Sequence, residues 1–187
     1  SIVDSFFESM SGITTTGATV ISGLDDLPKS LLIYRQLLQW LGGMGLIVLA
    51  IAVMPLLGIG GGQLFKTQTP GPMSEQRLTP RITSTARALW SIYFVLTVLC
   101  IFAYRLAGMN NFDAVSHAFS TVSIGGFSTH DLSIGFFDSL SIEIVCITFM
   151  LLSAMSFAVH YSAIYRKQVL KYFYDPELRF FVFLLVI

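Results

Sequence analysis

Long apolar runs alternate with short polar segments along this chain. Three long apolar stretches carry no Asp, Glu, Lys or Arg: positions 36–65, 88–104 and 144–165. A helix needs about 20 apolar residues to cross the roughly 30 Å hydrocarbon core of a bilayer. The first and third runs are long enough, and the second is long enough if its ends extend. The pattern predicts membrane helices near 31–57, 86–107 and 138–165, and the start of another near position 177.

A short segment in front of two of these runs occurs twice, in a register that needs no gap. Residues 4–20 read DSFFESMSGITTTGATV and residues 113–129 read DAVSHAFSTVSIGGFST. Identical residues occupy matching positions in the two copies: Asp4 and Asp113, Ser11 and Ser120, and Gly17 and Gly126. Each copy is too short to span a bilayer and runs into hydroxyl residues and glycine. This pattern is typical of a segment that dips into a membrane and returns on the same side.

Composition supports a membrane location. Hydrophobic residues make up 54% of the chain and charged residues only 12%, which argues against a water-soluble domain of this size. If both dipping segments enter from one face, eight of the eleven basic residues lie on the other face: Lys66, Arg77, Arg81, Arg87, Arg166, Lys167, Lys171 and Arg179. By the positive-inside rule that face is cytoplasmic, so the dipping segments open outward.

The predicted division of the chain follows its composition. Residues 58–84 are rich in glycine and proline and are predicted as a cytoplasmic linker between two related units. A partial first repeat (pore helix, filter loop, spanning helix) precedes it at 1–57. A second repeat (helix, pore helix, filter loop, helix) is predicted at 85–171, and the start of a third at 172–187. Because the chain begins on Ser1 rather than methionine, we expect an internal piece of a longer protein.

The two dipping loops have the composition of a cation filter. Non-helical backbone inside a bilayer must be buried in protein or line water. Carbonyl oxygens that face a common axis can replace the water shell of an alkali ion, and glycine permits the backbone angles required. Residues 14–17 (TTTG) and 123–127 (SIGGF) offer such oxygens without a central carboxylate or histidine. A surface turn is the alternative interpretation, but the matched register of the two copies favours a pore element.

Other polar residues near the loops admit less specific roles. Asp4 and Asp113 lie where helices are predicted to start, so a structural role at the positive helix end is favoured over ion contact. His117 and His130 flank the second loop, and hydrogen bonding is favoured over a proton relay or a metal site. Arg35 is expected to snorkel or pair with an acid, although it could also stabilise the pore mouth.

The sequence resembles a known family at three places. Residues 9–19 (SMSGITTTGAT), 39–45 (QWLGGMG) and 123–131 (SIGGFSTHD) are similar to the bacterial TrkH potassium-uptake family of the Trk/Ktr/HKT superfamily. The resemblance implies an all-α, multi-pass protein of the bacterial inner membrane. Its fold would consist of four potassium-channel-like helix–pore-helix–helix repeats around a central pore, and two of the four filter segments would be present here. It also implies a homodimer and a cytoplasmic TrkA-type nucleotide-binding regulatory ring, with no nucleic-acid partner.

The resemblance also assigns site residues. Carried over by position, the filter glycines are Gly17 and Gly126, and four carbonyls face a potassium ion: those of Thr15, Thr16, Ile124 and Gly125. Potassium is the only ligand expected, and no organic cofactor is expected in this chain. The second loop has Ile124 and Gly125 where the first has Thr15 and Thr16. With one hydroxyl ligand fewer, we expect weaker ion binding than in a four-fold symmetric filter.

The favoured function is therefore potassium uptake through a carbonyl-lined selectivity filter. The alternative is an ion-coupled secondary transporter with discontinuous helices around a midplane site. Passive permeation and proton- or sodium-coupled transport both fit the sequence. An enzyme is not expected, because no paired carboxylates, Ser/His/Asp set or metal-ligand spacing converges within the apolar runs.

Overall fold

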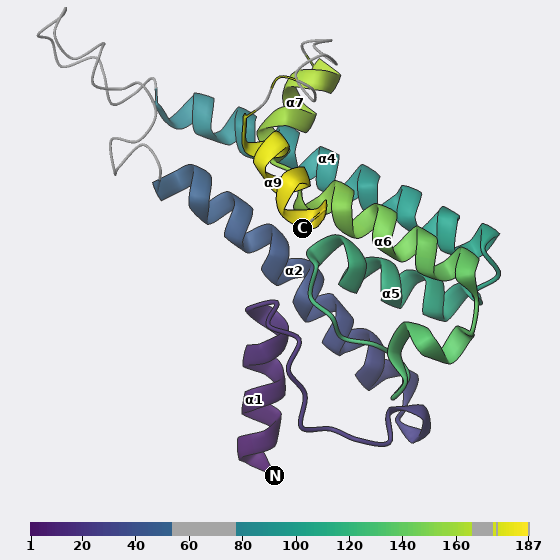
Figure 1. Cartoon of the computed structure of the whole chain (residues 1–187). Helices are drawn as coiled ribbons and strands as arrows, with labels where there is room; N and C mark the ends of the chain where they lie inside the picture. The colour runs from purple at the N-terminus through teal and green to yellow at the C-terminus, as the bar shows by residue number, and fades with distance from the viewer. Residues whose placement is uncertain (54–77, 166–173, 175, 187) are drawn as a thin grey trace, which may run out of the picture.

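The computed structural model describes residues 1–53, 78–165, 174 and 176–186, and all regular secondary structure in these ranges is helical (Figure 1). The elements are α1 (Ile2–Ile13), the 3-10 helix η1 (Leu24–Asp26), α2 (Lys29–Val53), α4 (Leu78–Leu106), α5 (Asn111–Ser123), the 3-10 helix η2 (Ser133–Phe137), α6 (Leu140–Ala154), α7 (Phe157–Tyr165) and α9 (Pro176–Val186). The prediction of an all-α fold is confirmed for this part of the chain.

The short helix α5 lies at the centre of the packing. It contacts α2, α4 and α6, whereas α1 packs along α2. Figure 1 shows α1 and α5 on either side of α2. The hydrophobic core lies around α4 and α5 and is formed by Met44, Tyr93, Cys100, Tyr104, Met109, Ala114, Ala118, Val122 and Ile142. The helix α5 is therefore held by three neighbours, and α2 is the element that both short helices share.

Matching caps start the two short helices. The Ser1 hydroxyl accepts a hydrogen bond from the Asp4 amide at 3.2 Å, and the Asn110 side chain accepts one from the Asp113 amide at 2.9 Å. These caps satisfy amides that have no partner within the helix. Ser1 and Asn110 also match in the register that pairs the two loops. Asp4 and Asp113 each lie in the first helical turn, which confirms their predicted place at helix starts.

The helix predicted near 138–165 is two helices rather than one. The helix α6 ends at Ala154, Met155 is extended with φ −69° and ψ 149°, and α7 begins at Phe157. The break leaves carbonyls of the last turn of α6 without helical partners. The His160 Nε2 lies 2.8 Å from the Leu152 carbonyl oxygen and supplies one of the missing bonds. The prediction of one continuous helix is wrong because no proline or glycine marks the break, which is compensated by a side chain eight residues further along the chain.

Helix α4 extends further than the sequence predicted. It begins at Leu78, within the stretch 58–84 assigned to a linker. The rest of that stretch before Leu78 lies outside the described residues. Within the described ranges, Ala86–Leu106 is the helix long and apolar enough to cross a membrane, and Leu140–Ala154 is apolar but shorter. The division of the chain into repeats stays a prediction.

Candidate functional site

The loops that follow α1 and α5 share one backbone conformation. Thr15 and Gly17 have φ of 55° and 75°, and Ile124 and Gly126 have φ of 54° and 85°. The left-handed residues thus occupy the same places in both copies, and the residue between each pair lies outside that region. A left-handed conformation is a genuine outlier for β-branched residues, and both Thr15 and Ile124 are β-branched. Backbone strain of this kind persists only where surrounding contacts hold it in place.

The first peptide groups of both loops fold back onto their helices. The Thr16 amide donates to the Ser11 carbonyl at 3.0 Å, and the Gly125 amide donates to the Ser120 carbonyl at 2.9 Å. The N–H and C=O groups of a trans peptide point in opposite directions. The carbonyls of the preceding residues, Thr15 and Ile124, are therefore directed away from the two helix ends. The C-terminal end of a helix carries partial negative charge, which favours a cation beyond it.

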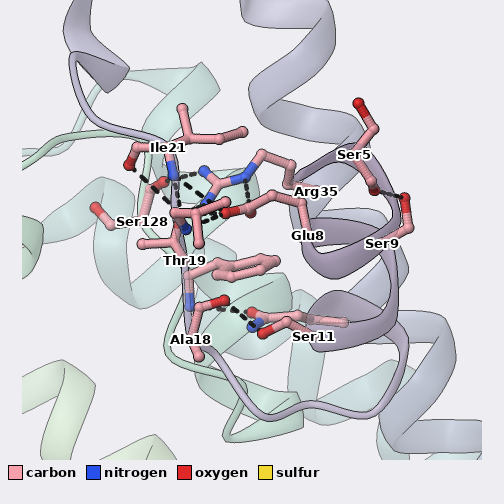
Figure 2. A network of polar contacts seen from close by, with 12 residues as sticks. Ser5, Glu8, Ser9, Ser11, Ala18, Thr19, Ile21, Arg35 and Ser128 are labelled. Carbon is pink, nitrogen blue, oxygen red and sulfur yellow. Dashed lines mark hydrogen bonds and ion pairs between the residues drawn. The ribbon is translucent and has the colours of Figure 1, made fainter. Parts of the chain in front are cut away.

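A serine hydroxyl then ties each loop to its helix. Ser11 donates to the carbonyl of Ala18 at 2.5 Å, and Ser120 donates to the carbonyl of Phe127 at 2.6 Å. Figure 2 shows the first of these bonds. Both bonds close the chain just after Gly17 or Gly126, so each loop is a tight, internally bonded turn.

The two loops lie against each other. A Cβ atom placed on Gly17 would overlap the carbonyl oxygen of Gly125 and would lie 3.5 Å from the Gly126 Cα. Glycine at position 17 is therefore required by the neighbouring loop as well as by its own positive φ. Tertiary packing has brought together two segments that are far apart in sequence.

The support behind the second loop is the side chain of Gln39, which is fully buried. Its Nε2 donates to the Gly125 carbonyl at 2.7 Å, and its Oε1 accepts from the Ser120 hydroxyl at 2.8 Å and the Phe127 amide at 3.1 Å. The Gly125 carbonyl was expected to face an ion, and here it accepts a hydrogen bond from α2. Sequence reasoning did not single out Gln39, although a glutamine inside a long charge-free run is a usable signal of a buried hydrogen-bonding role.

The support behind the first loop is ionic. Arg35 Nε lies 3.2 Å from Glu8 Oε2, and the two side chains are only 3% and 7% exposed. The Glu8 carboxylate also accepts from the Thr19 hydroxyl at 2.5 Å (Figure 2). Arg35 therefore pairs with an acid, as one interpretation predicted, and the snorkelling interpretation is wrong.

Comparison with known proteins places these features in a family. A family model described as TrkH, cation transport protein, matches residues 1–187, the whole chain. The chain belongs to the TrkH family. The potassium uptake protein TrkH of Halomonas elongata is 59% identical over 182 residues, which cover 97% of this chain and 38% of that protein. Its Escherichia coli K12 counterpart is 52% identical over 181 residues, again 97% and 38% of the two chains.

A solved structure in the TrkH family has the same fold. The crystal structure of the potassium transporter TrkH from Vibrio parahaemolyticus matches with a TM-score of 0.84 and 54% identity. The match covers 98% of this chain and 36% of that one. The chain thus spans less than two fifths of the length of the relatives it matches.

The histidines of this TrkH-family chain serve hydrogen bonding. His117 is buried between the Asp113 carbonyl and the Ser128 hydroxyl, both at 3.0 Å. His130 bridges Asp113, at 3.3 Å, and Asp25. The hydrogen bond from His130 holds the pKa of the Asp25 carboxyl below its usual range. Both histidines thus make the kind of hydrogen bond that the sequence predicted. Within the described residues no group of three or more His, Cys, Asp or Glu is arranged to hold a metal ion.

Helix α2 also packs closely against the C-terminal ends of the two short helices. A Cβ on Gly42 would overlap the carbonyl oxygen of Ile13, and a Cβ on Gly43 would lie 3.0 Å from the Ser123 Cβ. Two successive glycines of α2 therefore receive the C-terminal ends of α1 and α5. Small residues of this kind allow helix backbones to pack closely.

Proposed function

We propose that this chain supplies two segments of a potassium selectivity filter in a membrane transporter. The observation that carries the proposal is the pair of loops with matching left-handed residues, packed against each other at Gly17 and Gly125. Hard monovalent cations bind neutral oxygens, and a row of backbone carbonyls can replace the ion's water shell. The TrkH relatives are potassium uptake proteins by name, which supports potassium as the ion.

The proposed ligands are the carbonyl oxygens of Thr15, Thr16, Ile124 and Gly125, with Gly17 and Gly126 as the filter glycines. Thr15 and Ile124 carry the strongest support, because their carbonyls point away from the helix ends. The Gly125 oxygen already accepts from Gln39. Since a carbonyl oxygen has two lone pairs, it can hold this bond and still contribute to an ion site.

The proposal extends to the whole protein. Two filter segments leave a ring of ligands incomplete, so we propose four helix–pore-helix–helix repeats around one pore, with this chain covering the first, the second and the start of a third. The protein would be a multi-pass, homodimeric transporter of the bacterial inner membrane rather than an enzyme. A cytoplasmic TrkA-type nucleotide-binding ring would regulate it.

One observation favours a second candidate. The helix break at Met155 gives the discontinuous helix that is typical of ion-coupled secondary transporters. Uptake that depends on a sodium or proton gradient, at a fixed membrane potential, would support this candidate.

The decisive experiment is rubidium uptake into vesicles that contain the full-length protein. An imposed inside-negative voltage is expected to drive uptake, and potassium is expected to compete for it far better than sodium. Protein-free vesicles provide the background. No voltage-driven rubidium uptake above that background would contradict the proposal.

A further inference from the structure

The pair Glu8 and Arg35 stands apart from the other ion pairs of the chain. Among the pairs that the described residues form, it is the one in which both side chains are almost completely buried. Removing two charges from water is costly unless further hydrogen bonds satisfy the remaining lone pairs and protons. A buried pair of this kind is weak support for stability, so its other contacts decide what it does.

Each of the three nitrogens of the Arg35 guanidinium donates a hydrogen bond. Besides Glu8, its NH2 group donates to the Thr19 hydroxyl at 3.1 Å, and its NH1 group donates to the Ser128 carbonyl at 3.4 Å. Its charged centre lies 4.2 Å from the centre of the Phe127 ring, which is the geometry of a cation–π interaction. Thr19 and Ser128 are matching residues, each shortly after the filter glycine of its loop. The Arg35 side chain of α2 therefore contacts both loops at matching positions.

Glu8 binds, through its carboxylate, the segment that follows the first loop. In addition to the Thr19 hydroxyl, its carboxylate accepts from the amides of Val20 at 2.7 Å and Ile21 at 3.3 Å. Figure 2 shows Glu8 and Arg35 converging on this segment, with Ser128 on the far side of the guanidinium. The exit of the first loop is thus fixed to α1 through Glu8 and to the second loop through Arg35.

The second repeat has no equivalent pair. In the register that matches the two loops, the counterpart of Glu8 is His117. His117 contacts Ser128, as Glu8 contacts Thr19, but an imidazole replaces the carboxylate. The helix that follows the second loop, α6, contains no lysine or arginine. A single arginine therefore serves both loops.

We infer that Arg35, held by Glu8, is a positioning residue that sets the spacing between the two filter loops and thereby the discrimination between potassium and sodium. The inference rests on the proposed function. Arg35 touches backbone and side chains just beyond the proposed ligands and does not contact the ion. A guanidinium suits this role because its rigid fork can bind several acceptors at once, which a lysine ammonium on a flexible stem does less well.

The test measures the potassium-to-sodium permeability ratio of the full-length protein in vesicles at equal amounts of folded protein. Arg35→Gln and Glu8→Gln are each expected to lower the ratio by about tenfold, because each leaves a buried charge unpaired. Arg35→Lys should restore only part of the ratio. Lys29→Gln is the matched control: it removes a cation from the exposed start of the same helix, and its ratio should equal that of the wild type.

A second variant covers the case in which loss of a buried charge prevents folding. Thr19→Val keeps both charges and the shape of the side chain but removes the hydroxyl that Glu8 and Arg35 share. It is expected to lower the ratio about threefold. A wild-type protein that conducts neither potassium nor rubidium would reject the proposed function. A wild type that conducts potassium, together with an unchanged ratio in Thr19→Val and in every folded Arg35 variant, would reject this inference alone.

Discussion

The two loops that follow α1 and α5 have the same backbone conformation but are held in place by different side chains. The first is supported by an ion pair, and the helix in front of it buries only Glu8, Ser11 and Gly12. The second is supported by the neutral side chain of Gln39, and most of its helix α5 is buried among three neighbouring helices. The two copies share the left-handed positions, the side-chain caps at the helix starts, and a serine hydroxyl that donates to the carbonyl just after the left-handed glycine. The backbone conformation is thus common to both copies, while the side chains behind it differ.

The largest expected difference between the loops concerns their glycines. Gly17→Ala places a Cβ into the Gly125 carbonyl, whereas the nearest atom to a Cβ on Gly126 is the Gly17 Cα at 4.0 Å. A left-handed alanine costs roughly 1–2 kcal/mol, and only Gly17→Ala adds a backbone overlap to this. We expect Gly17→Ala to abolish rubidium uptake and Gly126→Ala to reduce it in part.

Gly23→Ala is the control for the backbone cost alone. Gly23 has φ of 76°, and a Cβ there would meet nothing within 4 Å. Uptake in this variant should stay close to wild type. Equal loss of uptake in Gly17→Ala and Gly126→Ala would contradict the close contact between the loops.

The next effect in size tests the neutral support of the second loop. Gln39→Leu leaves the Gly125 carbonyl and the Phe127 amide without this partner, whereas the Ser120 hydroxyl keeps its bond to the Phe127 carbonyl. An unsatisfied buried group costs about 1–3 kcal/mol, so the free energy of unfolding should fall by at least about 2 kcal/mol. Thermal unfolding of the purified protein, read by tryptophan fluorescence, measures it.

Gln36→Leu provides a matched control on the same helix. Gln36 is equally buried, and its side-chain nitrogen and oxygen have no hydrogen-bond partner within the described residues. Replacing such a group with leucine should be neutral or stabilising. If both leucine variants destabilise the protein equally, the specific role of Gln39 is refuted.

A smaller effect is expected when the serine hydroxyl that bonds each loop to its helix is removed. Ser11→Ala and Ser120→Ala each remove one hydrogen bond to the returning chain, which should cost about 1 kcal/mol. Ser120→Ala should be the more harmful of the two because its hydroxyl also bonds to Gln39. The same unfolding measurement checks this order, and a larger loss of stability for Ser11→Ala than for Ser120→Ala would contradict it.

The smallest effect depends on pH and lies where η1 contacts His130, just after the second loop. The hydrogen bond from His130 lowers the pKa of Asp25, so this contact stabilises the fold above the ordinary aspartate pKa of about 3.9. The stabilisation is lost as the pH falls through the lowered value. Asp25→Asn should therefore unfold at a slightly lower temperature than wild type near neutral pH, and the gap should close below about pH 4.

Asp26→Asn is the neighbouring control and should show no such pH-dependent gap. A gap between Asp25→Asn and wild type that persists at low pH would indicate a cause other than the bond to His130.

The sequence predicted the parts of the site that depend on local chain chemistry. The register of the two copies, the aspartates at helix starts and the glycines at left-handed positions follow from residue types at fixed spacing. It did not predict the break between α6 and α7, because the apolar run contains no proline or glycine and the compensating His160 side chain lies eight residues beyond Leu152. It also did not single out Gln39: a glutamine within an apolar run is a signal, but the sequence does not reveal which buried polar groups its side chain contacts.

The amino-acid sequence by itself determined that the chain is helical, apolar and internally repeated, because these properties arise from hydrophobic runs and from the conformational preferences of individual residues. Only the tertiary structure decided that Gly17 lies against Gly125 and that Gln39 donates a hydrogen bond to a carbonyl that was expected to face an ion. It also decided that a single arginine contacts both loops. Those contacts join residues that lie far apart along the chain. They form because α2 passes behind both loops, and the path of a helix relative to distant segments is set by packing rather than by any pattern along the chain.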